Sequence, residues 1–364
     1  MSPLAGRTVA FCAPMKPPDH PVASGDRTIA RLVLAALARA GARPVIASRL
    51  RTLDTAGNAA AQARLCDEAS AEVERLVDAR AHGAALWLSY HCHYKAPDLI
   101  GPEVARRLGL AYAIVEPSLS PRRLSGPWAG FARAAVDACA RADRLFWTTP
   151  RDRPALEAAG HGARMVELPP FLDLGPRPAE LGRPARAPLR LVTVAMMRPG
   201  DKVESYRRLA AGLMRLEADW RLDAIGDGPA REAVVTRLAP FGARVRLRGV
   251  QDAGAVRRAM EAADLLVWPG VGEGVGLVWL EAAAAGLPVG AEYGPAARTV
   301  VLGGRRAAPD DPDALAAAIR AAAAGRAALS TLARTRAEAR HGLDAAAATL
   351  SSALGPLVAA EARA

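Results

Sequence analysis

Two glutamates, Glu273 and Glu281, lie on either side of a glycine-rich turn in the stretch GEGVGLVWLEAAAAG at 272–286. The apolar residues before it, DLLVWPG, predict a buried strand, and the residues after the turn predict a helix. Backbone N–H groups at the start of such a helix attract phosphate. A carboxylate accepts paired hydrogen bonds from vicinal hydroxyls, which a sugar and a ribose both present. One glutamate for each, with phosphate between them, fits a nucleotide-sugar; a purely structural turn is the alternative.

Lysine is the second signal, because it occurs only at Lys16, Lys95 and Lys202, whereas every other basic residue is arginine. Abundant Ala, Arg, Gly and Pro indicate a GC-rich genome in which arginine readily replaces lysine. The remaining lysines indicate positions where arginine does not serve, since the two side chains differ in shape and hydration. All three follow a predicted strand, although chance also explains this.

Alternating strands and helices predict the framework that positions these residues. In the first half, a helix is expected from Asp26, a candidate N-cap, to Gly41. Strands are expected there at 7–14, 43–48, 85–90, 110–116, 143–149 and 164–170. Strands are expected in the second half at 189–197, 220–226, 244–249, 264–270 and 287–292, and the chain is expected to be helical after about residue 312.

A segment rich in proline, glycine and charge at 175–188 predicts an inter-domain linker. We therefore expect the α/β class, with two Rossmann-like doubly wound domains facing a central cleft. The expected parts are an N-terminal acceptor-binding domain at 1–175, a linker at 176–188, a C-terminal nucleotide-sugar-binding domain at 189–342 and a helix at 343–364 that crosses back to the N-terminal domain.

Ligands of open parallel sheets bind outside the carboxyl ends of the strands. This rule selects the loops that follow the expected strands. These loops are at 15–25, 91–98, 116–123, 198–202, 226–229, 249–252 and 270–277, and they contain all three lysines.

The net charge of +11 invites a nucleic-acid or membrane interpretation. The arginines are scattered along the sequence, however, which is typical of a solvated surface. We expect no nucleic-acid partner. An anionic substrate and a weak peripheral contact with the inner face of a membrane remain as alternatives.

The four cysteines, Cys12, Cys66, Cys92 and Cys139, are widely spaced and form no CxxC motif. This spacing argues against a zinc site or a redox pair, and unpaired thiols are typical of a reducing cytoplasm. The N-terminal residues contain no long apolar stretch of the kind found in signal peptides. No apolar stretch of membrane-spanning length is free of charge. We therefore expect a cytoplasmic, bacterial protein.

Two other nucleotide motifs are imitated but incomplete. IGDGPARE at 225–232 contains G-x-G, but Arg231 occupies the third glycine position of the dinucleotide fingerprint, and the motif does not follow the first strand. AMMRPGDK at 195–202 lacks the spacing of a phosphate-binding P-loop. A dehydrogenase and a P-loop enzyme are therefore excluded.

The stretch from Glu273 to Glu281 resembles the E-x7-E motif of family-4 retaining glycosyltransferases with the GT-B fold, the glycosyl transferases group 1. RPGDK at 198–202 resembles the Arg and Lys pair of that family. The segments IGDGP, VRLRGV, ADLLVWPG and AGLPV then follow in the family's order. The resemblance is specific from about 189 to 310 and looser in the N-terminal half.

This resemblance implies a role for each matching position. Arg198 and Lys202 would hold the donor diphosphate and stabilise the leaving group as charge develops. Glu281 would bind the ribose hydroxyls, and Glu273 would bind the donor sugar. The remaining donor-site positions implied are Val275, Gly276 and Leu277 near the phosphates, Val250 in the loop near the base, and Gly25 in the N-terminal glycine loop.

The N-terminal half departs from the family pattern. Glu116 lies near the place where members often carry a histidine, and His91 and His93 occur one loop earlier. We name His93 and Glu116 as catalytic candidates beside Arg198, Lys202 and Glu273. Alternate residues of an extended segment face opposite sides, so the two histidines are expected to point in opposite directions.

The resemblance implies a retaining glycosyltransferase that moves a sugar from a nucleotide-diphosphate sugar to a glycan, a lipid or a small molecule. A glycan or a lipid-linked sugar is the expected acceptor partner. No cofactor and no metal are expected, and Asp201 and Asp227 are interpreted as turn residues. The alternatives are a GT-B nucleotide-sugar epimerase or hydrolase, and a non-catalytic sugar-nucleotide-binding protein.

Overall fold

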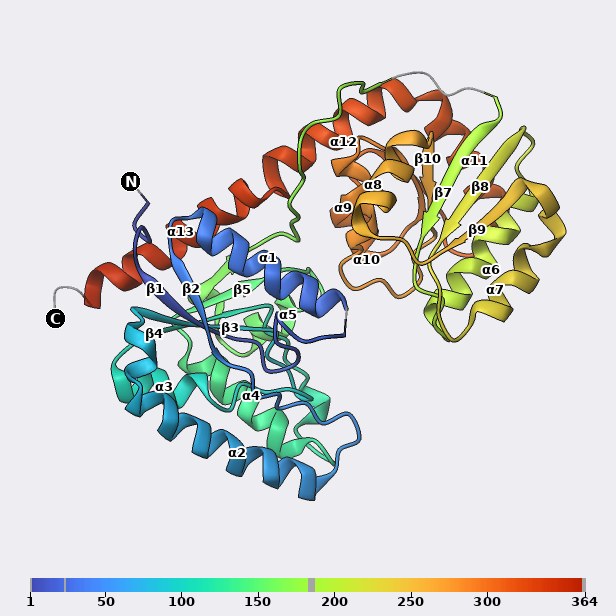
Figure 1. Ribbon diagram of the computed structural model, residues 1–364. Coiled ribbons are helices and arrows are strands. Elements are labelled where there is room, and N and C mark those ends of the chain that lie inside the picture. The colour runs from blue at the N-terminus through green and yellow to red at the C-terminus, as the bar shows by residue number, and fades with distance from the viewer. Residues whose placement is uncertain (1, 23, 183–186, 362–364) are drawn as a thin grey trace. The chain divides into compact units, whose positions relative to one another are not determined.

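The chain divides into two compact units in a computed structural model that describes residues 2–22, 24–182 and 187–361 (Figure 1). The first unit comprises Met1–Pro169 together with Leu343–Ala364, and the second comprises Pro170–Gly342. Part of the expected linker, residues 183–186, lies outside the described residues. Among the described helices, none has the length and apolarity needed to cross a membrane.

The first unit is built on a six-stranded parallel sheet with the strand order β2-β1-β3-β4-β5-β6. Its strands are β1 (Thr8–Cys12), β2 (Arg43–Ser48), β3 (Leu86–Tyr90), β4 (Ala111–Val115), β5 (Arg144–Trp147) and β6 (Met165–Glu167). Every residue of β1 and β3 is buried, as expected for central strands covered on both faces.

Helices cover this first sheet and form its hydrophobic core. They are α1 (Gly25–Arg39), α2 (Ala59–Asp78), α3 (Gly101–Leu108), α4 (Ala129–Arg141), α5 (Arg153–Ala158) and α13 (Leu343–Glu361). The last of these is far away in sequence but packs along α1 in the same unit. Apolar side chains of α2, α3 and α4 meet the sheet around Trp87 and Ile114.

The second unit has a six-stranded parallel sheet of order β12-β11-β10-β7-β8-β9. Its strands are β7 (Leu189–Val194), β8 (Trp220–Ile225), β9 (Val245–Gly249), β10 (Leu265–Val267), β11 (Val289–Glu292) and β12 (Gly304–Ala307). Its helices are α6 (Asp201–Met214), α7 (Arg231–Leu238), α8 (Ala253–Ala262), α9 (Leu277–Ala284), α10 (Pro295–Val300), α11 (Pro312–Ala324) and α12 (Arg326–Arg340).

All the expected strands are present, but two details of the prediction are wrong. The sequence analysis missed β12, whose residues GRRA contain no apolar run because it is an edge strand. The N-cap of α1 is Ser24, whose side chain accepts a hydrogen bond from the backbone N–H of Arg27, and not Asp26. The helix therefore starts one residue before Asp26, which leaves that carboxylate free for another contact.

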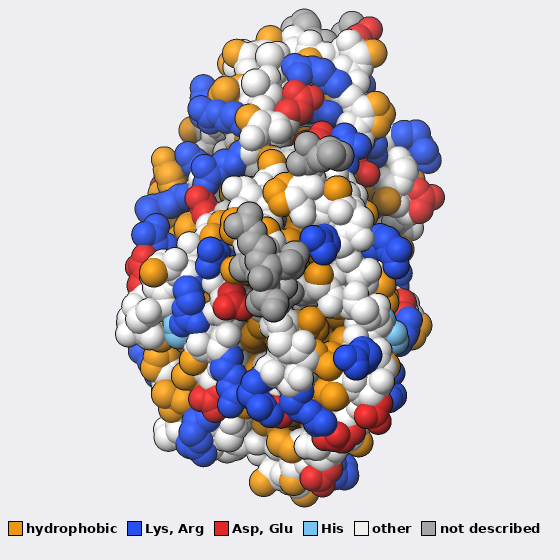
Figure 2. Space-filling view, turned by 90° about the vertical axis from the view of Figure 1, so that its left-hand side faces the viewer, with side chains coloured by type: hydrophobic (Ala, Val, Ile, Leu, Met, Phe, Trp, Pro, Cys, Tyr) orange, Lys and Arg blue, Asp and Glu red, His pale blue; other side chains and the backbone are white. Residues whose placement is uncertain are grey.

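The surface of the molecule reflects its arginine-rich composition. Figure 2 shows Lys and Arg side chains distributed over the whole of one face, among uncharged atoms and fewer acidic groups. On this face the basic residues are spread out, as the sequence analysis expected.

Candidate functional site

The second sheet changes direction between β7 and β10. These strands are neighbours, yet the chain runs outward from β7 to β8 on one side and from β10 to β11 on the other. A crevice forms outside the carboxyl ends of strands at such a switch point, and ligands of doubly wound sheets bind there. Lys202 follows β7 and Glu273 follows β10, so the fold brings both to this position.

Lys202 and Glu273 form an ion pair across the switch point. The indole N–H of Trp268 donates a second hydrogen bond, of 2.8 Å, to the same carboxylate oxygen of Glu273. The ammonium group of Lys202 also lies 5.5 Å from the centre of the Trp268 ring, within reach of a cation–π interaction. The Lys202 side chain remains 29% exposed, so its positive charge is held in place but stays accessible.

The glycine-rich loop at 270–276 is fixed against the start of α6. The backbone N–H of Val271 donates to the hydroxyl of Ser205 at 2.9 Å, and that hydroxyl donates to the carbonyl of Asp201 at 2.8 Å. A side chain at Gly272, whose φ is +64°, would collide with Asp201. The glycine therefore allows the loops after β7 and β10 to touch, which sets the position of Glu273.

Arg198 lies in the loop between β7 and α6 and is exposed. Its side chain has no hydrogen-bond or ion-pair partner among the described residues. The backbone beside it is held close to the loop after β8, because the N–H of Met197 donates to the carbonyl of Asp227 at 2.9 Å. A side chain at Gly226 would collide with the Ala195 carbonyl, so this glycine serves close backbone approach.

Helix α9 begins at Leu277, directly after the glycine-rich loop. Its N-cap, Gly276, has a φ of +73° and provides no side-chain cap. The N–H of Trp279 donates to the Gly276 carbonyl at 3.0 Å, whereas the N–H groups of Leu277 and Val278 have no acceptor among the described residues. These amides and the positive end of the helix dipole favour an anion at this place.

Glu281 lies in the second turn of α9. Its neighbours Leu280 and Ala282 are buried, but Glu281 itself is exposed. Desolvation by the surrounding protein raises the pKa of the Glu281 carboxyl to about 7. The helix period turns this one charged residue outward between buried neighbours.

Exposed apolar side chains mark the same edge of each sheet. Of the seven large hydrophobic side chains that are exposed among the described residues, five follow the carboxyl end of a strand. These are Val22, Leu124, Met196, Val250 and Tyr293. Val250 is the most exposed, at 76%, and lies in the loop assigned to the donor base. Apolar groups in these loops are available to pack against the flat faces of a base or a sugar.

The first sheet has its own switch point, between β1 and β3. Asp26 follows β1 in the first turn of α1, and His91 follows β3. Their side chains meet, with 3.0 Å between the Nδ1 atom of His91 and a carboxylate oxygen of Asp26. Gly25, expected at the donor, is the exposed first residue of the same helix.

The expectation that His91 and His93 point in opposite directions is wrong. Their ring centres are 4.7 Å apart. His91 has a φ of +59°, in the left-handed region, so the backbone turns and the alternation of an extended segment does not apply. The two rings therefore share one side of the loop after β3.

The pKa values of the two histidines are shifted in opposite directions. Burial lowers the pKa of His91, but the hydrogen bond to Asp26 and the nearby charge of Glu116 outweigh it, so this pKa is raised. Burial and the neighbouring His91 lower the pKa of His93 to about 3. The Nδ1 atom of His93 accepts from the backbone N–H of Lys95 at 3.1 Å, and its Nε2 atom lies 3.4 Å from the Met15 sulfur. His93 is thus neutral and has a partner at each nitrogen.

Glu116 follows β4 and lies close to this pair. Burial raises the pKa of the Glu116 carboxyl, and the charges of Asp152 and Asp26 raise it further against the opposing effect of His91. One carboxylate oxygen of Glu116 and the nearby hydroxyl of Tyr90 are both buried, and the interaction of the two groups partly offsets this increase in the pKa of Glu116. The pKa of the Glu116 carboxyl therefore lies above its ordinary value.

Comparison with known proteins identifies part of the chain. Residues 188–324 match the family model described as glycosyl transferases group 1. Over these residues the chain is similar to the group 1 glycosyl transferases. No curated protein matches the chain. Among solved structures, HepE from Anabaena in complex with UDP is 16% identical with a TM-score of 0.70, over 96% of this chain and 100% of that one.

Two further structures support the same fold. Sucrose-phosphate synthase from Thermosynechococcus elongatus is 20% identical, with a TM-score of 0.67, over 97% of this chain and 100% of that one. The lipopolysaccharide outer core galactosyltransferase WaaB is 16% identical, with a TM-score of 0.65, over 95% and 99%. The fold is therefore GT-B, and the match to the group 1 glycosyl transferase model lies in its second unit.

The second unit also contains residues that the sequence analysis did not select. Trp268 supports both Lys202 and Glu273, and Ser205 holds the glycine-rich loop. In the first unit, Asp26 was interpreted only as a helix cap. A buried tryptophan next to a strand end signals core packing in a sequence, so its contact with a charged pair appears only in the structure.

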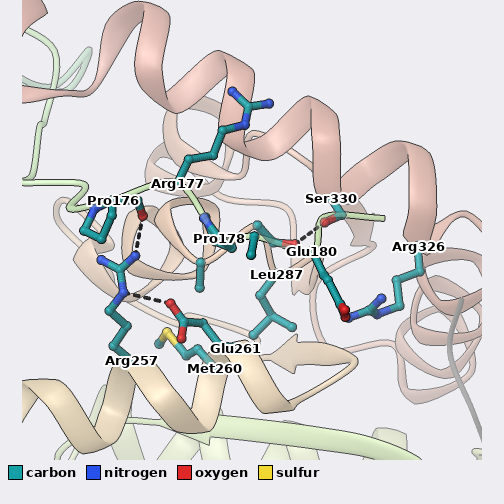
Figure 3. A pocket seen from close by; sticks show the side chains of 13 residues that line it. Pro176, Arg177, Pro178, Glu180, Arg257, Met260, Glu261, Leu287, Arg326 and Ser330 are labelled. Carbon is teal, nitrogen blue, oxygen red and sulfur yellow. Dashed lines mark hydrogen bonds and ion pairs between the residues drawn. The ribbon is translucent and has the colours of Figure 1, made fainter. Parts of the chain in front are cut away.

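A cavity of about 500 Å³ in the second unit lies away from these groups, beneath the segment at 176–180 (Figure 3). The charged side chains that line this cavity form hydrogen bonds and ion pairs with neighbouring groups of the protein. Arg257 donates to Glu261 at 2.8 Å and to the carbonyl of Pro176 at 2.6 Å. The cavity therefore lies where this segment attaches to the rest of the second unit. Among the described residues, no cluster of three or more His, Cys, Asp or Glu is arranged to hold a metal ion.

Proposed function

We propose that this chain is a retaining glycosyltransferase that transfers a sugar from a nucleoside-diphosphate sugar to a hydroxyl of a glycan, a lipid or a small molecule. In this reaction the anomeric carbon exchanges its bond to the diphosphate oxygen for a bond to the acceptor oxygen. Negative charge develops on the departing diphosphate. The protein must therefore present positive charge to the diphosphate and hydrogen-bond acceptors to the sugars.

One observation carries the proposal: a lysine, an unpaired arginine and an uncapped helix start occupy the switch point of a group 1 glycosyl transferase domain. Lys202 and Arg198 are the cations, and the first amides of α9, with those of Val275 and Gly276, are the neutral donors. Preorganised charges of this kind stabilise a leaving diphosphate without a metal ion.

Glu273 has a double role in this proposal. In the free protein it neutralises Lys202 and keeps the ammonium group above Trp268. When a donor binds, the diphosphate takes Lys202 as its partner, and Glu273 accepts hydrogen bonds from hydroxyls of the transferred sugar. The bond from Trp268 keeps the carboxylate in position during this exchange.

Glu281 and the loop with Val250 complete the donor half. Glu281 is exposed and unpaired among the described residues, so it is available to accept both ribose hydroxyls. Its raised pKa means that it binds them best above neutral pH, where the carboxyl is charged. Val250 presents an exposed apolar surface to the base.

The first unit provides the acceptor half. We assign His91, held by Asp26, to the acceptor hydroxyl, together with Glu116. His93 was named as the catalytic histidine from the sequence, but both of its nitrogens have partners within the loop. The Nε2 atom of His91 has no such partner among the described residues, so the role passes to His91.

The first experiment is a thermal-shift screen of the purified protein against UDP-, GDP- and ADP-sugars. UDP-glucose is the leading probe, because the structurally similar Anabaena HepE has been crystallised with it. Nucleotide release is then measured with and without glycan and lipid-linked acceptors, and the products are analysed by NMR. Acceptor-dependent release with retained configuration supports the proposal. Release without transfer would indicate a hydrolase or epimerase, and binding without release would indicate a non-catalytic protein.

A further inference from the structure

The second unit carries an open sheet face at β8 and β9. In β8 the residues alternate between the buried Trp220 and Leu222 and the exposed or half-buried Arg221 and Asp223. In β9 exposed arginines occupy alternate positions in the same way. A doubly wound sheet covered on both faces has nearly continuous apolar strands. The alternation shows that one face of these two strands is not covered by a helix.

A groove of about 550 Å³ runs along this face and is bounded by α8. Its wall contains six arginines and a single acidic residue, Asp223. The arginines come from β7, β8, β9, α8 and the turn before β9, and they are Arg190, Arg221, Arg244, Arg246, Arg248 and Arg258. The lining of the other cavity described in this unit, beneath residues 176–180, has no such excess of positive charge.

Only half of these arginines have a partner. Arg190 binds Asp264 at 2.9–3.2 Å, Arg248 lies 3.2 Å from Asp223, and Arg244 stacks 4.5 Å from the centre of the Trp220 ring. The side chains of the other three have no hydrogen-bond or ion-pair partner among the described residues. These are Arg221, Arg246 and Arg258.

The strand register increases the concentration of charge. Arg190 of β7 is paired directly with Arg221 of β8, and both face the groove. Like charges at directly opposed positions destabilise a sheet. Asp264 compensates Arg190 and leaves Arg221 without a counter-charge. An anion in the groove would remove this repulsion.

We propose that this groove binds a phosphate-rich anion at a site separate from the donor site. Arg190, Arg221 and Arg246 stand near the beginnings of their strands, whereas the donor groups follow the carboxyl ends. A strand of five to six residues separates the two edges by about 17–20 Å. The groove thus forms a second anion site on the same domain.

The chemistry of the groove selects phosphate. An arginine side chain presents a planar fork of N–H donors that binds two phosphate oxygens at once. Three unpaired forks around one groove match a ligand with several phosphate groups. The wall on the α8 side carries small side chains, Ala255, Ala259 and Ala262, which leave space for such a ligand. A soluble polyphosphate and the headgroups of anionic phospholipids share this chemistry.

The test uses the full chain and two probes, inorganic tripolyphosphate in calorimetry and vesicles of phosphatidylglycerol in phosphatidylcholine in sedimentation. The variant R221Q/R246Q/R258Q removes the unpaired arginines, and Arg248 is kept because it lies next to the donor-base loop. The parent and both variants also carry R198Q and K202A, which removes the two proposed donor-site cations so that the probe reports on the groove. The expected result is a loss of about a hundredfold in affinity for at least one probe.

The matched control is R64Q/R305Q/R320Q, which removes three exposed arginines outside the groove and the same net charge. It should retain the binding. Loss for tripolyphosphate alone identifies a soluble anion, and loss for vesicles alone identifies lipid headgroups. Equal losses in both variants, or no binding of either probe by the parent, would overturn the proposal. If the triple variant does not fold, A259E adds a carboxylate to the groove wall from α8 and should also abolish binding.

Discussion

The two units place their reactive groups at the same topological position and give them different environments. Each sheet has a switch point, β1 and β3 in one and β7 and β10 in the other, and charged side chains meet there. In the second unit the cations remain accessible and face uncapped helix amides. In the first unit a histidine and carboxylates are largely buried, and their pKa values are displaced in opposite directions.

This difference supports the proposed division of the transfer reaction between the two units. Accessible cations hold a diphosphate and stabilise its departure, and their charge does not need to change during the reaction. Groups with displaced pKa values are suited to exchange a proton with a hydroxyl. We therefore expect variants of the second unit to lose donor chemistry, and variants of the first unit to change its dependence on pH.

The largest effect is expected for K202A. Loss of this cation should raise the barrier to transfer by about 2–4 kcal/mol, because the leaving diphosphate loses its main positive partner. Steady-state nucleotide release and thermal unfolding are measured together. R305A, a change at an exposed arginine on β12, is the control and should leave both unchanged. Near-normal turnover by K202A would show that Lys202 does not act in the donor site.

The next largest effect is expected for the two candidate donor-site glutamates, Glu273 and Glu281. E281Q should weaken binding of the bare nucleoside diphosphate about tenfold, since an amide cannot accept both ribose hydroxyls. E273Q should affect the complete donor more than the bare nucleotide. The affinity of the wild type should fall as pH decreases below neutral, because the raised pKa of Glu281 allows early protonation. Calorimetry at several pH values measures both effects, and equal losses in the two variants for the bare nucleotide would contradict the division.

A smaller effect is expected in the first unit for D26N. The raised pKa of His91 means that its pair with Asp26 stabilises the fold fully below the ordinary histidine pKa of 6.5, and that this stabilisation is lost as pH rises through the raised value. D26N should therefore cost about 1 kcal/mol of unfolding free energy at pH 6 and less at pH 9. Denaturant unfolding at both pH values tests this, with the exposed Asp137→Asn as control. A loss that is independent of pH would indicate a packing effect.

No effect at all is expected from removing divalent metal. In our proposal the diphosphate is neutralised by Arg198, Lys202 and helix amides. The carboxylate of Asp227 accepts a hydrogen bond from the N–H of Gly228 at 2.7 Å. Transfer should continue unchanged in excess EDTA. Activity that disappears and returns with magnesium would make Asp201 or Asp227 a metal ligand.

Sequence and structure contributed differently to the two sites. The apolar runs of the sequence predicted the strands. The ends of these strands then predicted which loops lie near a ligand, and these include the loops that contain Lys202 and Glu273. The pair of His91 and Asp26 could not be found in this way, because it depends on a left-handed backbone at His91 and on a helix that starts one residue before Asp26. The arginine groove had a signal in the alternation of WRLDAI and VRLRG, but the neighbouring order of β7, β8 and β9 is visible only in the fold.

The central claim is that the switch point of the second sheet binds a nucleoside diphosphate through Arg198 and Lys202. The most direct measurement is calorimetric titration of UDP, GDP and ADP into the wild type, R198Q/K202A and the control R305Q/R320Q, all in EDTA. The account predicts that the wild type and the control bind one nucleotide equally well, and that R198Q/K202A binds it about a hundredfold more weakly. Unchanged affinity in R198Q/K202A, with the protein folded, would contradict it.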